Sequence, residues 1–126
     1  MKIYISHSKE FNYKTDLYAP IKENSIYLNH EIIFPHDIFE DAKDFITKDI
    51  IKNCDLFIVE VSFPSTWSWI ELWIASTFWI PIICIYKKNS KISGSLKVIC
   101  NNFIEYNNKN DMIEKIEDFL NKTNIK

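Results

Sequence analysis

Short apolar runs rich in isoleucine and valine alternate along this chain with longer stretches that have the period of an α-helix. This alternation is typical of parallel strands connected by helices, because a strand covered on both faces is apolar throughout. We therefore predict an α/β fold with a single doubly wound, five-stranded parallel sheet and helices on both faces. The expected strands are 2–6, 31–34, 55–61, 81–86 and 102–105, and the expected helices are 11–25, 39–53, 66–79, 93–100 and 109–122.

The bulk composition indicates one soluble domain over residues 1–126, since single cores of this size are common. Apolar residues make up 47% of the chain and charged residues 25%, which is far from the disordered class. The net charge of -2 gives no broad reason to bind nucleic acid or an anionic membrane. We expect a small molecule or a protein as the partner, with no nucleic acid and no membrane.

The cysteines and basic residues narrow the possible chemistry. Cys54, Cys84 and Cys100 show no paired spacing of the metal or redox kind, so we expect no metal and no cofactor. The apolar run at the start is too short for a signal peptide, and we expect a cytoplasmic protein. All fifteen basic residues are lysine, so any phosphate must be held by lysine, hydroxyl or backbone N–H groups.

Glu71 is the first candidate for chemistry. The segment EVSFPST, residues 60–66, has the pattern of a strand, a tight loop and a helix start, with Ser65 or Thr66 suited to the N-cap. A helix N-terminus can bind an anion. Glu71 follows just over one turn later between apolar neighbours, and desolvation there raises a carboxyl pKa or requires a partner. It is either a nucleophile or acid/base group, or a structural carboxylate paired with a lysine.

Other polar residues fall at the carboxyl ends of the expected strands, where Rossmann-like sheets bind ligands. Ser6, His7 and Ser8 lie at the end of the first strand and at the start of the loop after it, and they could bind a phosphate or sugar, or be ordinary loop polarity. His36 follows the second strand and could line the same edge or lie on the surface. Tyr4 faces either the cleft or the core.

Five segments, taken together, resemble the nucleoside 2-deoxyribosyltransferase superfamily. They are KIYISHS, IIFPH, CDLFIVEVSFPSTWSWIELWIA, IPIICIYKK and SKISGSLKVI. The nearest branch looks like the 2′-deoxynucleoside 5′-phosphate N-hydrolases. The most specific motif is a strand ending in A-E-V and then P-S-x-G-x-G-x-E-L-G-x-A, which appears here as V-E-V (59–61) and P-S-T-W-S-W-I-E-L-W-I-A (64–75).

This resemblance implies an enzyme that cleaves or transfers the N-glycosidic bond of deoxynucleosides or their 5′-monophosphates. It implies a covalent intermediate on Glu71 and an orienting role for Tyr4. It also implies phosphate contacts from Ser8, Ser65 and Ser95, the last reaching across the interface of a homodimer. Positions 67 and 69, here Trp67 and Trp69, would approach the sugar and phosphate.

Two positions depart from the family pattern. The family's acidic residue in the helix before the third strand falls on Thr47, and the nearest aspartate, Asp49, would point elsewhere on a helix. The family's first-loop arginine has only Lys9 as a counterpart. A catalytically silent nucleotide-binding or interaction module is therefore one alternative. Another is a domain similar to TIR domains, which would cleave NAD or signal by self-assembly, indicated by ISHS and W-S-W-I-E-L.

All four tryptophans lie between residues 67 and 79, in a chain with one glycine where average usage gives about nine. Trp67, Trp69 and Trp73 occupy glycine positions of the motif, and Trp79 follows a helix where a left-handed glycine is expected. The four do not form one apolar helix face. Some bacterial codes read UGA as glycine, and we hypothesise that these positions are such codons. The alternative is an aromatic lid or partner surface.

Overall fold

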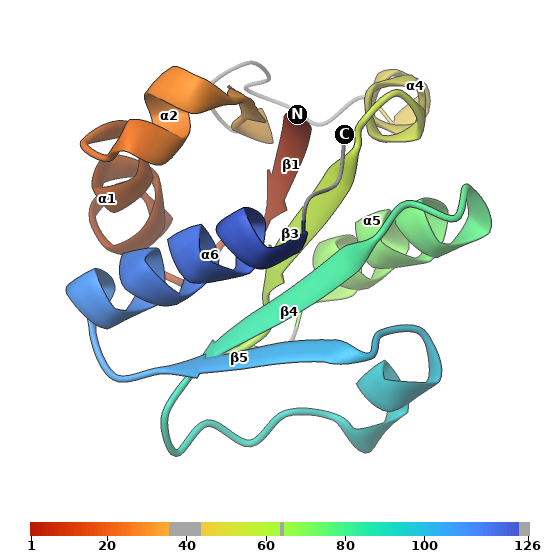
Figure 1. Cartoon of the computed structure of the whole chain (residues 1–126). Helices are drawn as coiled ribbons and strands as arrows, with labels where there is room; N and C mark the ends of the chain where they lie inside the picture. Colours follow the sequence, from red (N-terminus) through yellow and green to blue (C-terminus); the bar gives the residue numbers. More distant parts are fainter. Residues whose placement is uncertain (36–43, 64, 124–126) are drawn as a thin grey trace.

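The computed structural model describes residues 1–35, 44–63 and 65–123, without the side chains of 44–46 and 123 (Figure 1). Its five-stranded, all-parallel sheet has the order β2-β1-β3-β4-β5, which confirms the predicted doubly wound fold. Each strand is found within one residue of the predicted ends. The strands are β1 (Lys2–Ser6), β2 (Glu31–Ile33), β3 (Leu56–Glu60), β4 (Ile82–Lys87) and β5 (Asn102–Tyr106).

The helices follow the predicted positions, except near the first of them. The expected helix 11–25 is divided at Asn24, whose backbone is extended and which is the N-cap of α2. Before it, η1 continues directly into α1, and Pro20 lies in the first turn of α1, where a missing N–H group costs no helical hydrogen bond. Of the expected helix 39–53, residues 39–43 lie outside the described part. The helical elements are η1 (Lys14–Tyr18, a π turn), α1 (Ala19–Lys22), α2 (Ser25–Asn29), α4 (Asp44–Lys52), α5 (Thr66–Thr77), η2 (Gly94–Val98, a 3₁₀ helix) and α6 (Lys109–Thr123).

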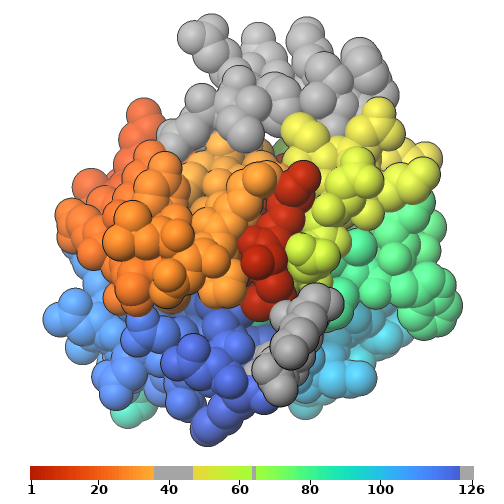
Figure 2. Space-filling model, turned by 45° about the horizontal axis from the view of Figure 1, so that its top comes forward, coloured from red at the N-terminus to blue at the C-terminus, as the bar shows by residue number. Residues whose placement is uncertain are grey.

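Helices cover both faces of the sheet, with α1, α2 and α6 on one face and α4 and α5 on the other (Figure 1). Successive strand side chains point to opposite faces. Ile3 and Ile5 therefore enter the core under α1 and α6, while Tyr4 packs under α5 with Phe57 and Leu72. Figure 2 shows the amino-terminal edge of the sheet, where the start of β1 reaches the surface between the α1–α2 segment and the beginning of β3.

The strand order sets the place for a site. The chain runs from β1 outward to β2 and then returns to β3 on the other side of β1. Such a reversal opens a crevice at the carboxyl ends of the two central strands, where doubly wound proteins bind ligands. Ser6 pairs with Val59 at these ends, and the loop from β3 to α5 begins directly beyond them.

The end of α5 has an unusual residue in a common motif. Trp79 has a φ of 59°, its N–H donates to Ser76 O at 3.1 Å, and Ile80 N–H donates to Ala75 O at 3.0 Å. These two bonds form a Schellman motif, in which the left-handed residue is usually glycine. The predicted left-handed backbone at position 79 is confirmed. The Trp79 side chain is 92% exposed, so its packing does little to offset the strain of this conformation.

No helix within the described ranges is both long enough and apolar enough to cross a membrane.

Candidate active site

The structure brings Glu71 and Tyr4 together, as the family resemblance implied. Glu71 lies in the second turn of α5 with only 2% of its surface exposed. The Tyr4 hydroxyl donates to Glu71 Oε2, and the Ser6 hydroxyl donates to Oε1 at 2.7 Å. Tyr4 and Ser6 are two residues apart on β1, so both point to the face that α5 covers. Each carboxylate oxygen is thus held by one hydroxyl group from the central strand.

Burial dominates the electrostatics of this carboxylate. It raises the pKa of Glu71 from 4.5 to about 7, although the hydrogen bonds from Tyr4 and Ser6 act in the opposite direction. Burial and the adjacent Glu71 carboxylate also raise the pKa of Tyr4, which therefore remains a proton donor at neutral pH. None of the ion pairs between described residues involves Glu71. The described residues therefore do not support the alternative in which Glu71 is a structural carboxylate paired with a lysine.

The loop before α5 provides a helix N-terminus next to this carboxylate. Ser65 is the N-cap, and its Oγ accepts the Ser68 N–H at 3.3 Å, as the EVSFPST pattern predicted. The Ser68 hydroxyl is buried and has no hydrogen-bond partner among the residues that the structure describes. The start of α5 therefore presents backbone N–H groups, a positive dipole end and an unused hydroxyl.

A narrow cleft opens at this edge of the sheet. Its volume is about 70 Å³, whereas ligand pockets are usually about 300–1,000 Å³. Trp69 forms part of its wall, and Glu71 is not among the described residues that line it. Trp67 is half-buried and lies one helical turn before Glu71 on the same face of α5. Position 67 thus lies between Glu71 and the start of α5, and Trp69 forms part of the wall of the cleft there.

Lys91 and Ser93, which follow β4, also line the cleft, and sequence reasoning did not single them out. Ser95 was predicted instead, but it is exposed on η2 and does not line the cleft. Its hydroxyl lies 2.6 Å from that of Ser93. Ser8 is buried, and its Oγ accepts the N–H of Glu10 at 3.1 Å. In the described protomer, therefore, only Ser65 of the predicted phosphate-contacting serines borders the cleft.

The remaining sequence candidates lie elsewhere. The His7 ring is buried on the α1 face, 2.6 Å from the Tyr18 hydroxyl and stacked on Tyr13. His36 falls outside the described residues. Thr47 is buried on α4, whereas Asp49 is exposed and does not replace an acidic group at that position.

Glu60 is a second buried carboxylate, on the opposite face of the sheet. It accepts hydrogen bonds from Tyr106 and from the backbone and side chain of Ser62, at 2.6 and 3.0 Å for the two Ser62 donors. Ser62 Oγ in turn accepts the N–H of Lys87 at 2.8 Å. Burial raises the pKa of Glu60, and these hydrogen bonds lower it. Both carboxylate oxygens of Glu60 already accept hydrogen bonds, and through these bonds Glu60 connects the loop after β3 to β4 and β5. The strand motif V-E-V contains it, but nothing in the sequence indicates these partners.

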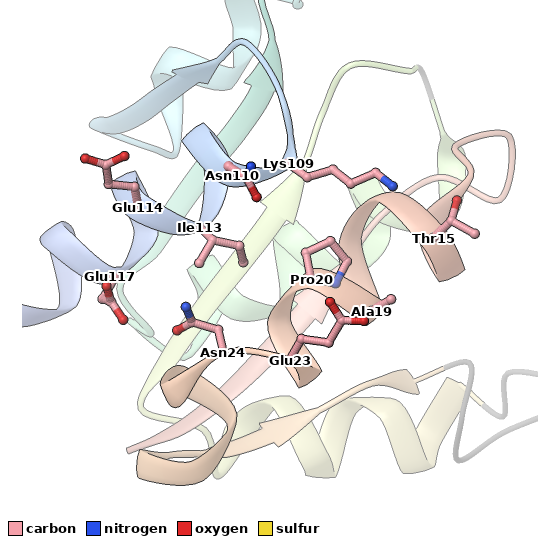
Figure 3. A pocket seen from close by; sticks show the side chains of 10 residues that line it. All are labelled: Thr15, Ala19, Pro20, Glu23, Asn24, Lys109, Asn110, Ile113, Glu114 and Glu117. Carbon is pink, nitrogen blue, oxygen red and sulfur yellow. The ribbon is translucent and has the colours of Figure 1, made fainter.

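A wider cleft of about 600 Å³ lies between α1 and α6, on the face of the sheet away from Glu71 (Figure 3). Glu23, Glu114, Glu117 and Lys109 border it. In the described part of the chain, no three His, Cys, Asp or Glu side chains gather so that they could hold a metal ion.

The fold and the site define a doubly wound α/β protein with a buried, hydroxyl-bound carboxylate at the switch point between β1 and β3. No protein-family model and no curated protein sequence matches the chain. Among solved structures, it is similar to a CMP N-glycosidase of Clostridium botulinum, with a TM-score of 0.67 and 21% identity over 93% of this chain and 99% of the other.

Two further structures are similar to it. A 2-deoxyribosyltransferase from the psychrotolerant bacterium Bacillus psychrosaccharolyticus has a TM-score of 0.62 and 18% identity, over 89% of this chain and 90% of the other. A conserved protein from Enterococcus faecalis V583 has a TM-score of 0.63 and 12% identity, over 94% and 98%. These likenesses show that the chain has the fold expected from the resemblance to nucleoside 2-deoxyribosyltransferases.

Proposed function

We propose that this protein cleaves or transfers the N-glycosidic bond of deoxynucleosides or deoxynucleoside 5′-monophosphates, with Glu71 as the nucleophile. The observation that supports this most directly is a buried carboxylate held by Tyr4 and Ser6 at the switch point. The fold is shared with a CMP N-glycosidase and a 2-deoxyribosyltransferase, whose names specify N-glycosidic chemistry.

In the proposed reaction, ionised Glu71 attacks the anomeric carbon of the sugar through an oxocarbenium-like transition state. The bond between the sugar and the base breaks, its electron pair leaves with the base, and the base takes up a proton. The resulting glycosyl ester is attacked by water in hydrolysis, or by a second base in transfer, which releases the Glu71 carboxylate. Tyr4 holds the carboxylate in place. Because the pKa of Glu71 is about 7, the rate should rise as pH increases through neutrality.

A 5′-phosphate would lie near the start of α5, where backbone N–H groups and Ser65 are available. Lys91 supplies positive charge at the same cleft, which supports this placement in a chain without arginine. We also propose a homodimeric, cytoplasmic protein, in which Ser8 and the partner's copy of Ser95 would complete the phosphate contacts. Light scattering in solution measures the dimer directly.

The test is a panel of deoxynucleosides and their 5′-monophosphates, with free base measured by chromatography. It uses the chain as it stands and a variant with glycine at positions 67, 69, 73 and 79. Base release that is lost in Glu71→Gln and kept in Glu105→Gln, an exposed carboxylate on β5, would support the proposal. No base release from either protein with any substrate would refute it.

A catalytically silent nucleotide-binding module is the second candidate. It is favoured by the closure of the site, since Glu71 is buried and the nearby cleft has a volume of only about 70 Å³. Binding of a deoxynucleotide without turnover, by the glycine variant as well, would point to this function.

A further inference from the structure

Within the described ranges, Ser6 is one of two hydrogen-bond donors to the buried Glu71 carboxylate. Its side chain is fully buried at the end of β1, and its hydroxyl lies 2.7 Å from Oε1. Tyr4 occupies the other oxygen, so neither hydroxyl duplicates the other. Tyr18 and Cys54 also contribute to the raised pKa of Tyr4, and the Cys54 thiol donates a hydrogen bond to Ile50 O.

A buried carboxylate without a cation remains ionised only if hydrogen-bond donors stabilise its negative charge. Hydrogen bonds to charged groups are stronger than those between neutral groups. Removal of the Ser6 hydroxyl would leave Oε1 in an apolar environment with no donor from β1. The neutral acid, which is a poor nucleophile, would then be favoured, and the carboxyl group could rotate about its remaining bond to Tyr4.

We propose that Ser6 is a positioning residue that keeps Glu71 ionised and fixes the orientation of its carboxylate. This inference rests on the proposed function, in which ionised Glu71 attacks the sugar. It assigns a role to the last residue of β1, which the sequence marked only as polar.

The direct test is the titration of the Glu71 side-chain carboxyl, followed by ¹³C NMR in ligand-free protein. Ser6→Ala should increase the proton affinity of Glu71 by roughly tenfold or more. Ser6→Cys keeps a weaker donor and should give an intermediate value. Ser76→Ala, a serine change farther along α5, is the matched control and should leave the titration unchanged.

An unchanged Glu71 titration in a Ser6→Ala protein with a native circular dichroism spectrum would overturn the inference. If the protein releases base, the acid limb of its kcat/KM profile should move to higher pH in Ser6→Ala, by one pH unit for each tenfold increase in the proton affinity of Glu71. If no substrate is turned over, the proposed function fails while the NMR titration still decides the role of Ser6.

The backbone at Trp79 has a conformation that favours glycine. A bulky residue with φ of 59° in a Schellman motif is in a conformation that glycine adopts without strain. The indole is 92% exposed and that of Trp73 is 62% exposed. Large apolar side chains at these two positions thus gain little from burial in the described protomer.

The other two tryptophans lie in the first turn of α5, at the helix end next to the cleft. Trp69 forms a wall of a cleft of about 70 Å³, and Trp67 lies on the Glu71 face of α5, one turn nearer the sheet edge. Glycine at both positions would remove two indoles from the first turn of α5, would enlarge the cleft that Trp69 lines and would leave the N-terminus of the helix more accessible. Glycine at all four positions therefore removes strain at one end of α5 and two large side chains at the other.

We infer that the natural protein has glycine at positions 67, 69, 73 and 79, as expected if UGA codons are read as glycine. Peptide mass spectrometry of the protein isolated from its natural source tests this without any assay of activity. Glycine at all four positions is the expected result, and tryptophan at any of them overturns the inference. Peptides that contain Gly94, encoded independently of this segment, provide the control.

Discussion

Replacement of Trp79 offers a direct measure of the backbone strain at the end of α5. A left-handed conformation costs an L-residue about 1–2 kcal/mol, and glycine avoids this cost. Glycine also has greater freedom in the unfolded chain than alanine, which offsets about 0.4–1 kcal/mol. Trp79→Gly and Trp79→Ala lose the same indole, which is 92% exposed. Trp79→Gly should therefore be the more stable of the two by about 0.8 kcal/mol.

This difference corresponds to roughly 3 °C in Tm for a domain of this size, and it can be measured by thermal or urea denaturation. The matched pair is Trp73→Gly and Trp73→Ala, at an exposed position inside α5 where φ is helical. There alanine should be the more stable by about 1 kcal/mol, because glycine is a poor helix former. The reasoning is refuted if alanine is also preferred at position 79.

Three further changes test the site and its supports. Ser65→Ala should lower the free energy of unfolding by about 1 kcal/mol, since the N-cap acceptor for Ser68 N–H is lost, and urea denaturation measures it. Tyr106→Phe should lower it by about 2 kcal/mol, because a buried hydrogen bond to the Glu60 carboxylate is removed; equal stability of the variant would count against that contact. Glu71 binds protons more tightly in the folded state, with a pKa of about 7 against 4.5 when unfolded, so its contribution to stability is complete below about pH 4.5 and is lost as pH rises through 7. Stability should fall by about 3 kcal/mol over this interval, and Glu71→Gln should remove that part of the slope.

The sheet could be predicted from sequence because each strand is a short, uninterrupted apolar run bounded by polar residues. The pairing of Tyr4 with Glu71 came from a motif resemblance and not from periodicity. The structure supplies the physical reason for this pairing: the Tyr4 side chain lies on the face of the sheet that α5 covers. The N-cap at Ser65 was also predictable, since it depends on local backbone chemistry.

Contacts that depend on the order of the strands in the sheet could not be predicted from the sequence. Lys91 and Ser93 approach the start of α5 only because β4 lies beside β3. The network around Glu60 requires Tyr106, which is 46 residues away, and the adjacency of β4 to β5. The bond from Ser6 to Glu71 required knowledge that β1 ends directly opposite the second turn of α5. No periodicity or spacing encodes these relationships.

The Glu60 network also has a consequence for how the molecule can move. It fixes the base of the β3–α5 loop to two neighbouring strands through hydrogen bonds of Ser62, Lys87 and Tyr106. The segment that follows β4, which carries Lys91 and Ser93, is largely exposed and is not part of a strand. One wall of the cleft is therefore held by a buried hydrogen-bond network, whereas the other is an exposed segment outside the strands, where local opening costs less. Under the proposed function, adaptation to substrates of different size is expected in residues 89–95, and this segment would be the first place to vary in order to change base or phosphate selectivity.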